Sequence, residues 1–251
     1  MAAATGLVAV AVAGGVTARQ QEHPSRPVTT DEAGRLALSR LTSYEASPVV
    51  VEVEVPDGDA RTRVHGLVDY RTGHAVGSYE STAGATGLLA WDATGLGVAP
   101  GQRRTVPEAV GAAAGMPPNA WSARAYTDDP LDAALRVVMV LGTDRPDNAQ
   151  LLAQSGARWL RTERLADGRG YDVFSGPLPR DHAGGEARLS YWVDGEGNLG
   201  RFRLRVDGLA QPVTVDLTER RATHQVPATP WEVPGRGTGR TPAPSSGPTP
   251  G

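Results

Sequence analysis

The sequence contains no cysteine, which excludes disulfide bonds, thiolate metal ligands and a cysteine nucleophile. It also contains no lysine, so all 25 of its basic residues are arginine. Aromatic residues make up only 5% of the chain and hydrophobic residues 39%, which is enough for a largely aliphatic core. The formal net charge of −3 argues against a general nucleic-acid-binding protein, so we expect no nucleic-acid partner. The 251 residues suffice for one domain of about 200 residues with tails.

The amino-terminal segment is apolar from Ala2 to Ala18 apart from two threonines. At about 17 residues it is marginal for a membrane span and long for a signal-peptide core. Residues 1–18 are therefore predicted to be either a signal peptide cleaved after Ala18 or a membrane anchor. No basic residue precedes this segment, whereas Arg19 follows it, an order that opposes export of an uncleaved anchor. We expect a basic segment upstream of this start, and a protein that is secreted or held outside the cytoplasmic membrane by this helix.

Two further segments are predicted to lie outside the folded domain. Residues 19–28 have the composition of a linker. Residues 223–251 are rich in proline, glycine, threonine and serine and bury too little apolar surface to offset the entropy of ordering, so they are predicted to be a disordered tail. The folded domain is accordingly placed at residues 29–222.

Within this domain, the hydrophobic pattern predicts two antiparallel meanders separated by short helices. Thr29 and Glu32 have the spacing of a capping box, which starts a helix over residues 31–44. A helical region follows the first meander, and its strongest helix begins at Asp129 with Pro130 in the first turn. The predicted strands are 47–55, 62–70, 74–81 and 86–94, then 157–165, 170–177, 187–194, 200–208 and 212–220.

The stretch LSYWVDGEGNLGRFRLRVDG, residues 189–208, predicts a hairpin with two different faces. A turn near residues 196–197 places Tyr191 opposite Phe202 and Leu189 opposite Leu204 on an apolar face.

The other face of this hairpin carries a row of arginines, Arg201, Arg203 and Arg205. In this register Trp192 lies opposite Arg201 and Ser190 opposite Arg203, and Asp216 of the next strand can meet the row. Such a row is typical of a solvated sheet face. The alternative is a docking site for anionic lipid head groups or a cell-wall polymer.

Three stretches resemble a known family: VHGLVDYRTGHAVGSYES, LLAQSGARWLRTERLADGRGYDVFSGP, and YWVDGEGNLGRFRLRVDG with PVTVDLTER. Together with the order of helix, meander, helical insert and second meander, residues 31–222 resemble the LolA-like fold. The resemblance is closest to actinobacterial lipoproteins of the LppX/LprG type.

The resemblance implies an α+β fold, a strongly curved antiparallel β-sheet that forms an incomplete barrel with helices covering the concave face. It also implies a lipid or acylated ligand, whose chains lie between sheet and helices, and a carrier function in the cell envelope. The alternative is a regulatory sensor like RseB, which shares the architecture and would bind a membrane partner such as an anti-sigma factor. The chain departs from the lipoproteins because it has no lipobox cysteine, so a lipid anchor is not expected.

We expect a monomer that is not an enzyme and has no cofactor. Glu52 and Glu54 lie about 7 Å apart on one strand face, but solubilising charges have the same pattern as a catalytic pair. The five histidines are scattered, and no metal site is predicted. The apolar faces of the strands are expected to bind the ligand; the alternative is a closed core without a ligand. The candidate ligand-binding residues are Val51, Val53, Val68, Tyr70, Tyr191, Phe202, Leu204 and Val215.

Overall fold

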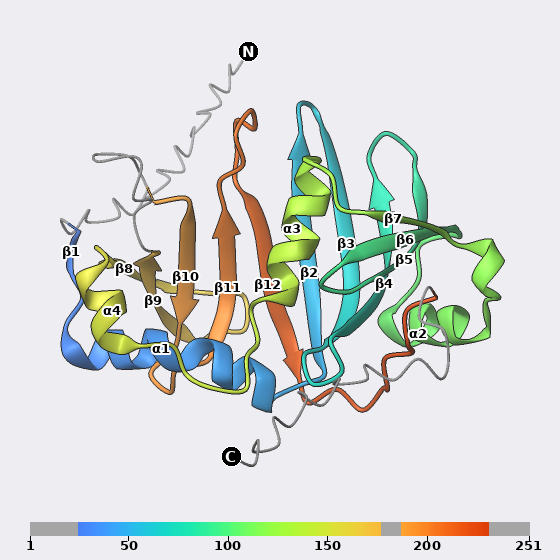
Figure 1. The fold of residues 1–251 in the computed structure, drawn as a ribbon. Coiled ribbons are helices and arrows are strands. Elements are labelled where there is room, and N and C mark those ends of the chain that lie inside the picture. The colour runs from blue at the N-terminus through green and yellow to red at the C-terminus, as the bar shows by residue number, and fades with distance from the viewer. Residues whose placement is uncertain (1–24, 177–186, 231–251) are drawn as a thin grey trace, which may run out of the picture.

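The computed structural model describes residues 25–176 and 187–230, which form a 12-stranded antiparallel sheet with four α-helices (Figure 1). The predicted signal peptide or anchor, residues 1–18, lies outside the described residues, as does most of the predicted tail. The strands are β1 (Arg26–Pro27), β2 (Val49–Asp57), β3 (Ala60–Asp69), β4 (His74–Ser81), β5 (Thr86–Trp91), β6 (Gly95–Pro100), β7 (Ser122–Ala125), β8 (Arg158–Arg164), β9 (Gly170–Ser175), β10 (Leu189–Val193), β11 (Leu199–Leu204) and β12 (Val213–Arg220).

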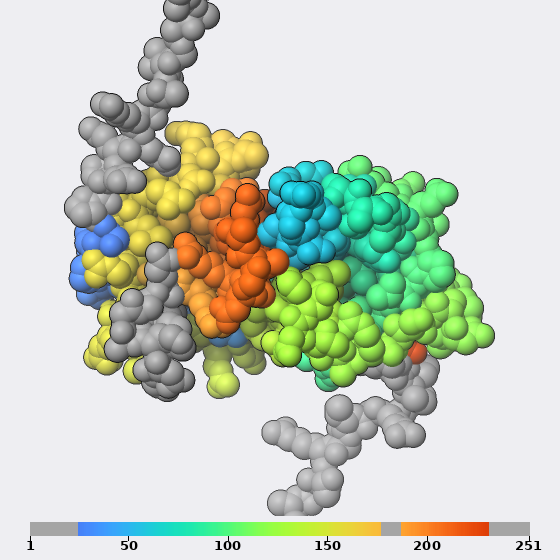
Figure 2. All heavy atoms as spheres, turned by 90° about the horizontal axis from the view of Figure 1, so that it is seen from above, coloured from blue at the N-terminus to red at the C-terminus, as the bar shows by residue number. Residues whose placement is uncertain are grey.

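The sheet consists of two meanders, β2–β7 and β8–β12, which meet where β12 pairs with β2. At this junction Val215 lies opposite Val53. Seen from above, the junction brings the orange atoms of the second meander against the blue atoms of the first (Figure 2). β1 pairs with β8 and β7 with β6, so these two short strands form the edges and the sheet does not close into a barrel.

The sheet curves strongly around its main core. Buried residues of this core come from every strand between β9 and β6 in the sheet order, from Phe174 to Leu96. A flat sheet of that width would extend roughly 40 Å, whereas a helix is only about 10 Å across. Because helices α1 (Thr30–Glu45) and α3 (Pro130–Met139) contribute to the same core, the sheet bends around them. The predicted α+β class with an open, curved antiparallel sheet is confirmed.

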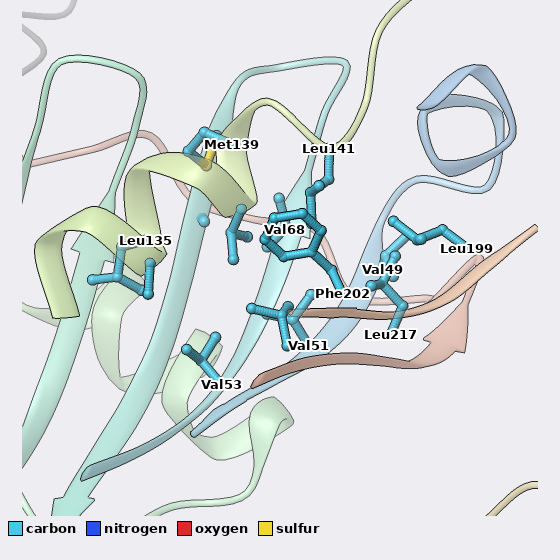
Figure 3. Packing of buried hydrophobic residues seen from close by; sticks show 14 of the residues in the cluster. Val49, Val51, Val53, Val68, Leu135, Met139, Leu141, Leu199, Phe202 and Leu217 are labelled. Atoms are coloured by element: carbon cyan, nitrogen blue, oxygen red, sulfur yellow. The ribbon is translucent and has the colours of Figure 1, made fainter. Parts of the chain in front are cut away.

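Three of the four helices cover the concave face, namely α1, α3 and the short α4 (Ala149–Gln154). The predicted capping box of α1 is confirmed, since the Glu32 amide donates to Thr29 Oγ1 and the Thr29 amide donates to the Glu32 carboxylate. Asp129 caps α3 by accepting from the Leu131 amide. Leu135 and Val138 of α3 are fully buried against β2 and β12, which closes the centre of the core (Figure 3).

The fourth helix, α2 (Val106–Gly115), packs on the opposite, convex face against β3, β4 and β5. The expectation that the helices cover the concave face therefore holds for α1, α3 and α4 only. The alternating pattern explains the exception, because Val50, Leu67 and Val76 point away from the main core and need their own cover. The 3₁₀-helix Pro118–Ala120 follows α2 and leads into β7.

The folded part is longer than the predicted residues 29–222. Arg26 and Pro27, expected in a linker, pair with Trp159 and Arg158 of β8. At the other end Val226, expected in the tail, is buried in the convex-face cluster beside α2. The first segment is held by strand pairing and the second by burial. Neither was predicted, because two to four residues are too few to show a periodic hydrophobic pattern.

The predicted hairpin register is confirmed at each predicted pair: Leu189–Leu204, Ser190–Arg203, Tyr191–Phe202 and Trp192–Arg201. The predicted meeting of the arginine row with Asp216 is also confirmed: Arg201 forms a two-pronged ion pair with Asp216 at 2.5 and 2.9 Å.

Candidate functional site

An apolar groove lies on the concave side, between the end of α3, helix α4 and strands β10 and β11. Its volume is ≈ 1160 Å³, somewhat larger than ordinary ligand pockets, which hold roughly 300–1,000 Å³. The lining residues are Arg40, Val137, Val140, Leu141, Asp147, Asn148, Leu151, Leu152, Gln154, Ser155, Gly156, Leu189, Tyr191 and Phe202.

One wall of the groove is formed by α4 and the segment that joins it to α3. Asn148 caps α4 by accepting from the Leu151 amide at 3.0 Å. α4 buries none of its side chains, and Leu151 remains 61% exposed. Val140, at the end of α3, is 52% exposed. Val140 and Leu151 therefore give this wall an exposed apolar surface that faces the groove.

The floor of the groove comes from the predicted hairpin. Leu189 and Tyr191 of β10 and Phe202 of β11 alternate on the concave face, as the register predicts. Phe202 is almost fully buried, whereas Leu189 and Tyr191 keep part of their surface open. Burial raises the pKa of the Tyr191 hydroxyl to about 12, so this group stays neutral at any physiological pH.

Arg40 of α1 ties the α3–α4 connection to the helix layer. Its Nε donates to the Val140 carbonyl at 2.8 Å and its Nη1 to Asp147 Oδ1 at 2.9 Å. Two backbone bonds add to this, from the Thr143 amide to the Arg40 carbonyl and from the Asp147 amide to the Ala37 carbonyl. The wall is thus held by a few hydrogen bonds at its base while its apolar side chains face the groove.

The structure separates the predicted ligand-binding residues into three groups. Tyr191 and Phe202 line the groove. Leu204 is half-buried and packs at the margin of the main core. The remaining five residues lie in the packed core: Val51, Val53, Val68, Tyr70 and Val215. Figure 3 shows Val51, Val53 and Val68 beneath α3 and its continuation.

The wall residues Val140, Leu151 and Leu152 are not among the ligand-binding residues predicted from the sequence. They lie in a helical insert and its connection, where the pattern is too short to distinguish a core face from an open one. The available signal was the adjacent pair Leu151–Leu152 in a six-residue helix, since a helix of that length cannot bury two neighbouring leucines on one face.

The carboxylate pair considered for catalysis lies on the convex face, away from the groove. Glu54 is contacted by Arg61 at 3.3 Å and Arg63 at 3.2 Å, and Glu52 lies 3.9 Å from His65. Each of these carboxylates therefore has a basic neighbour, and Asp216, which lies opposite Glu52 on β12, is itself paired with Arg201. Within residues 25–176 and 187–230, no group of three or more His, Asp or Glu side chains is arranged to hold a metal ion.

Among the described helices, none has the length and hydropathy needed to cross a membrane. No protein-family model matches the sequence, and no curated protein matches it either.

The solved structures that are similar to this chain include the following three. The lipoprotein LppX of Mycobacterium tuberculosis has 13% identity over 79% of this chain and 98% of its own, with a TM-score of 0.43. An uncharacterized conserved protein of Thermus thermophilus has 8% identity over 77% and 91%, with a TM-score of 0.38. A domain described as an outer membrane lipoprotein-sorting protein of Vibrio parahaemolyticus has 7% identity over 70% and 86%, with a TM-score of 0.23.

LppX is one of the lipoproteins that the sequence was predicted to resemble, so this similarity agrees with the predicted resemblance. The likenesses are distant, however, and carry no argument about the ligand. The function proposed below therefore rests on the groove of this chain.

Proposed function

We propose that this protein binds a lipid or another acylated ligand in the apolar groove and carries it in the cell envelope without chemical change. The observation that supports this most directly is the open wall of the groove, where Val140 and Leu151 are 52% and 61% exposed above an aromatic floor. An acyl chain has the chemistry to cover such surfaces because it is apolar along its whole length and needs no polar partner.

The energetics favour long chains over short ones. Burial of one methylene contributes about 0.8 kcal/mol, so a 16-carbon chain contributes roughly 12 kcal/mol when it is fully covered. Association costs about 4–15 kcal/mol in lost freedom, and an eight-carbon chain would hardly offset that cost. We therefore expect affinity to rise steeply with chain length. The proposed extracytoplasmic location is supported by the apolar character of residues 1–18.

The test is native mass spectrometry of the full chain incubated with hexadecanoic acid. The wild type is expected to show a discrete bound species, and Leu151→Glu is expected to lose it, because a carboxylate in the wall must be desolvated by the chain. Leu38→Glu is the matched control: Leu38 is also an exposed leucine on a concave-side helix, 38% exposed, but it does not line the groove. Equal uptake by the two variants would contradict binding in this groove.

A further inference from the structure

A second, smaller groove lies on the convex face, on the other side of the sheet from the apolar groove. Its volume is ≈ 450 Å³, and most of its lining is polar or charged. The lining residues are Glu52, Val53, Glu54, Arg63, Val64, His65, Ser78, Tyr79, Glu80, Arg103, Arg201, Arg203, Thr214 and Asp216. It spans the junction of the two meanders, where β11 and β12 meet β2 and β3.

Two cross-strand rows form the floor of this convex groove. In one row Arg201 lies opposite Asp216, and their side chains form the two-pronged ion pair described above. In the other row Arg203 lies between Ser190 of β10 and Thr214 of β12, both of which carry hydroxyls. Directly opposite side chains are about 4.5–5.5 Å apart at Cβ, so the two hydroxyls flank the arginine.

The other charged residues along these rows form ion pairs with one another, and Arg203 does not take part in them. Glu54 is contacted by Arg61 and Arg63, and Glu80 lies 3.5 Å from Arg103. The side chain of Arg203 forms no ion pair and no hydrogen bond with any residue in the described ranges. The hydroxyls of Ser190 and Thr214 likewise have no hydrogen-bond partner in that part of the chain.

Arg203 is also partly removed from water. Its guanidinium lies over the ring of Trp192, 5.1 Å from the centroid, and Arg161 lies over the same ring at 5.7 Å. Burial, and then the neighbouring charge of Arg201, lowers the pKa of Arg203. Two N–H groups here, Arg203 Nε and Trp192 Nε1, are buried without an acceptor in the described residues. The position therefore holds a positive charge with unused donors. The carboxylates whose charges act on it, Glu163 and Asp216, are each ion-paired with another arginine, Arg161 and Arg201.

We propose that Arg203, flanked by the hydroxyls of Ser190 and Thr214, binds one oxyanion of the phosphate class on the convex face. A guanidinium presents its donors in a planar fork that fits two oxygens of a phosphate group at once. The two hydroxyls supply further donors on either side of the fork. A halide offers no such pair of oxygens, so the site distinguishes phosphate from chloride by geometry rather than by charge alone.

The test is an NMR titration of the ¹⁵N-labelled full chain with inorganic phosphate. Phosphate replaces chloride during the titration, so that the ionic strength stays constant. The indole N–H signal of Trp192 and the Nε–H signal of Arg203 are expected to shift to a plateau. Arg203→Gln is expected to weaken phosphate binding roughly tenfold or more, because the amide cannot supply the charge that strengthens these hydrogen bonds. Arg188→Gln is the control, because Arg188 is exposed, pairs with Asp207 and does not line the convex groove.

Thr214→Val keeps the shape of the side chain and removes its hydroxyl. It therefore distinguishes binding at a specific site from a general electrostatic attraction of phosphate to the arginines. The proposal expects a several-fold weaker phosphate affinity in this variant, with unchanged unfolding. If phosphate shifts the two signals no further than chloride does, or if Arg188→Gln loses as much affinity as Arg203→Gln, the proposal is overturned.

The source of the phosphate group is determined in a second arm with vesicles. A lipid head group as the natural source predicts that the wild type sediments with phosphatidylcholine vesicles containing phosphatidylglycerol, and that Arg203→Gln does not. A soluble phosphate ester as the source predicts saturable phosphate binding without sedimentation. Either result supports an oxyanion site at Arg203. Because Arg203→Gln does not alter the apolar groove, failure of the oxyanion site and failure of the proposed lipid binding are distinguished by separate measurements.

Discussion

Tyr191 and Phe202 face each other across β10 and β11, with their ring centroids 5.2 Å apart and an angle of 64° between the ring planes. Such an edge-to-face pair contributes about 0.5–1.5 kcal/mol beyond the burial of its surface. The two rings differ in their surroundings, since Phe202 reaches into the packed core and Tyr191 remains partly open in the groove. The pair therefore marks the boundary between the part of the concave face that is closed and the part that is open.

This boundary predicts different costs for removing the two rings. Phe202→Ala leaves a cavity in the core and is expected to lower the free energy of unfolding by about 3–5 kcal/mol. Tyr191→Ala is expected to cost no more than about half of that, because the ring already borders solvent. Urea unfolding of both variants checks the difference. Equal losses would mean that the groove floor is as closed as the core.

The anchoring of the α3–α4 connection by Arg40 predicts a local effect. Arg40→Gln removes the bonds to the Val140 carbonyl and to Asp147, and is expected to lower global stability by only about 0–1 kcal/mol, because this ion pair is partly exposed. Hydrogen exchange of the amides in residues 140–148 is nevertheless expected to accelerate. Arg136→Gln on α3 serves as control, since Arg136 is exposed and forms no ion pair in the described part of the chain. Unchanged exchange in Arg40→Gln would show that the backbone bonds alone hold this wall.

Stability in acid is predicted to depend on Glu32. Hydrogen bonds from Arg26 at 2.6 and 2.7 Å, with the Thr29 amide, lower the pKa of this carboxyl to about 2 from its model-peptide value of 4.5. Because the folded-state pKa is the lower one, the stabilisation is complete above pH 4.5 and is lost as the pH falls towards 2.

Glu32→Gln is therefore expected to unfold with a free energy roughly 2 kcal/mol smaller than the wild type at pH 7, a value reduced for the exposure of Arg26. Near pH 2 the two proteins are expected to converge. Chemical denaturation at a series of pH values measures both points. A constant difference across the series would show that the loss comes from the shape of the amide rather than from the charge.

Two glycines are predicted to respond in opposite directions to alanine. A Cβ at position 142 would lie 2.3 Å from the Tyr70 ring, so Gly142→Ala is expected to destabilise the protein by about 1–3 kcal/mol. Gly34 lies within α1, and a Cβ there meets nothing within 4 Å. Gly34→Ala is expected to stabilise by roughly 0.5–1 kcal/mol through helix propensity. Thermal unfolding of both variants decides this, and a stabilised Gly142→Ala would contradict the close packing of Tyr70.

Local pattern was sufficient for much of the fold. The register of β10 and β11 follows from strict alternation, because a slip of one residue would turn Phe202 outward. Thr29 and Asp129 mark the starts of α1 and α3 because cap residues act on the nearest turn only. The side of the sheet on which α2 packs was not predictable, since both faces of β3 and β4 carry apolar residues.

The location of the groove was beyond the reach of the sequence for a physical reason. An apolar residue on a strand, such as Val51 or Val68, is expected both in a core and in a lipid cavity, and only the position of α3 decides which one forms. The exposed wall depends on where the α3–α4 connection crosses the sheet, and that is set by long-range bonds between Arg40 and Val140.

The most direct test of the central claim is methyl NMR of the ¹³C-labelled chain with spin-labelled octadecanoic acid. The nitroxide is expected to broaden the methyl signals of Val140, Leu151 and Leu189, which line the apolar groove, in proportion to bound ligand. The signals of Leu38 and Val76, which lie elsewhere, are expected to stay sharp. No broadening, or equal broadening at Leu38 and Leu151, would contradict a ligand in the groove.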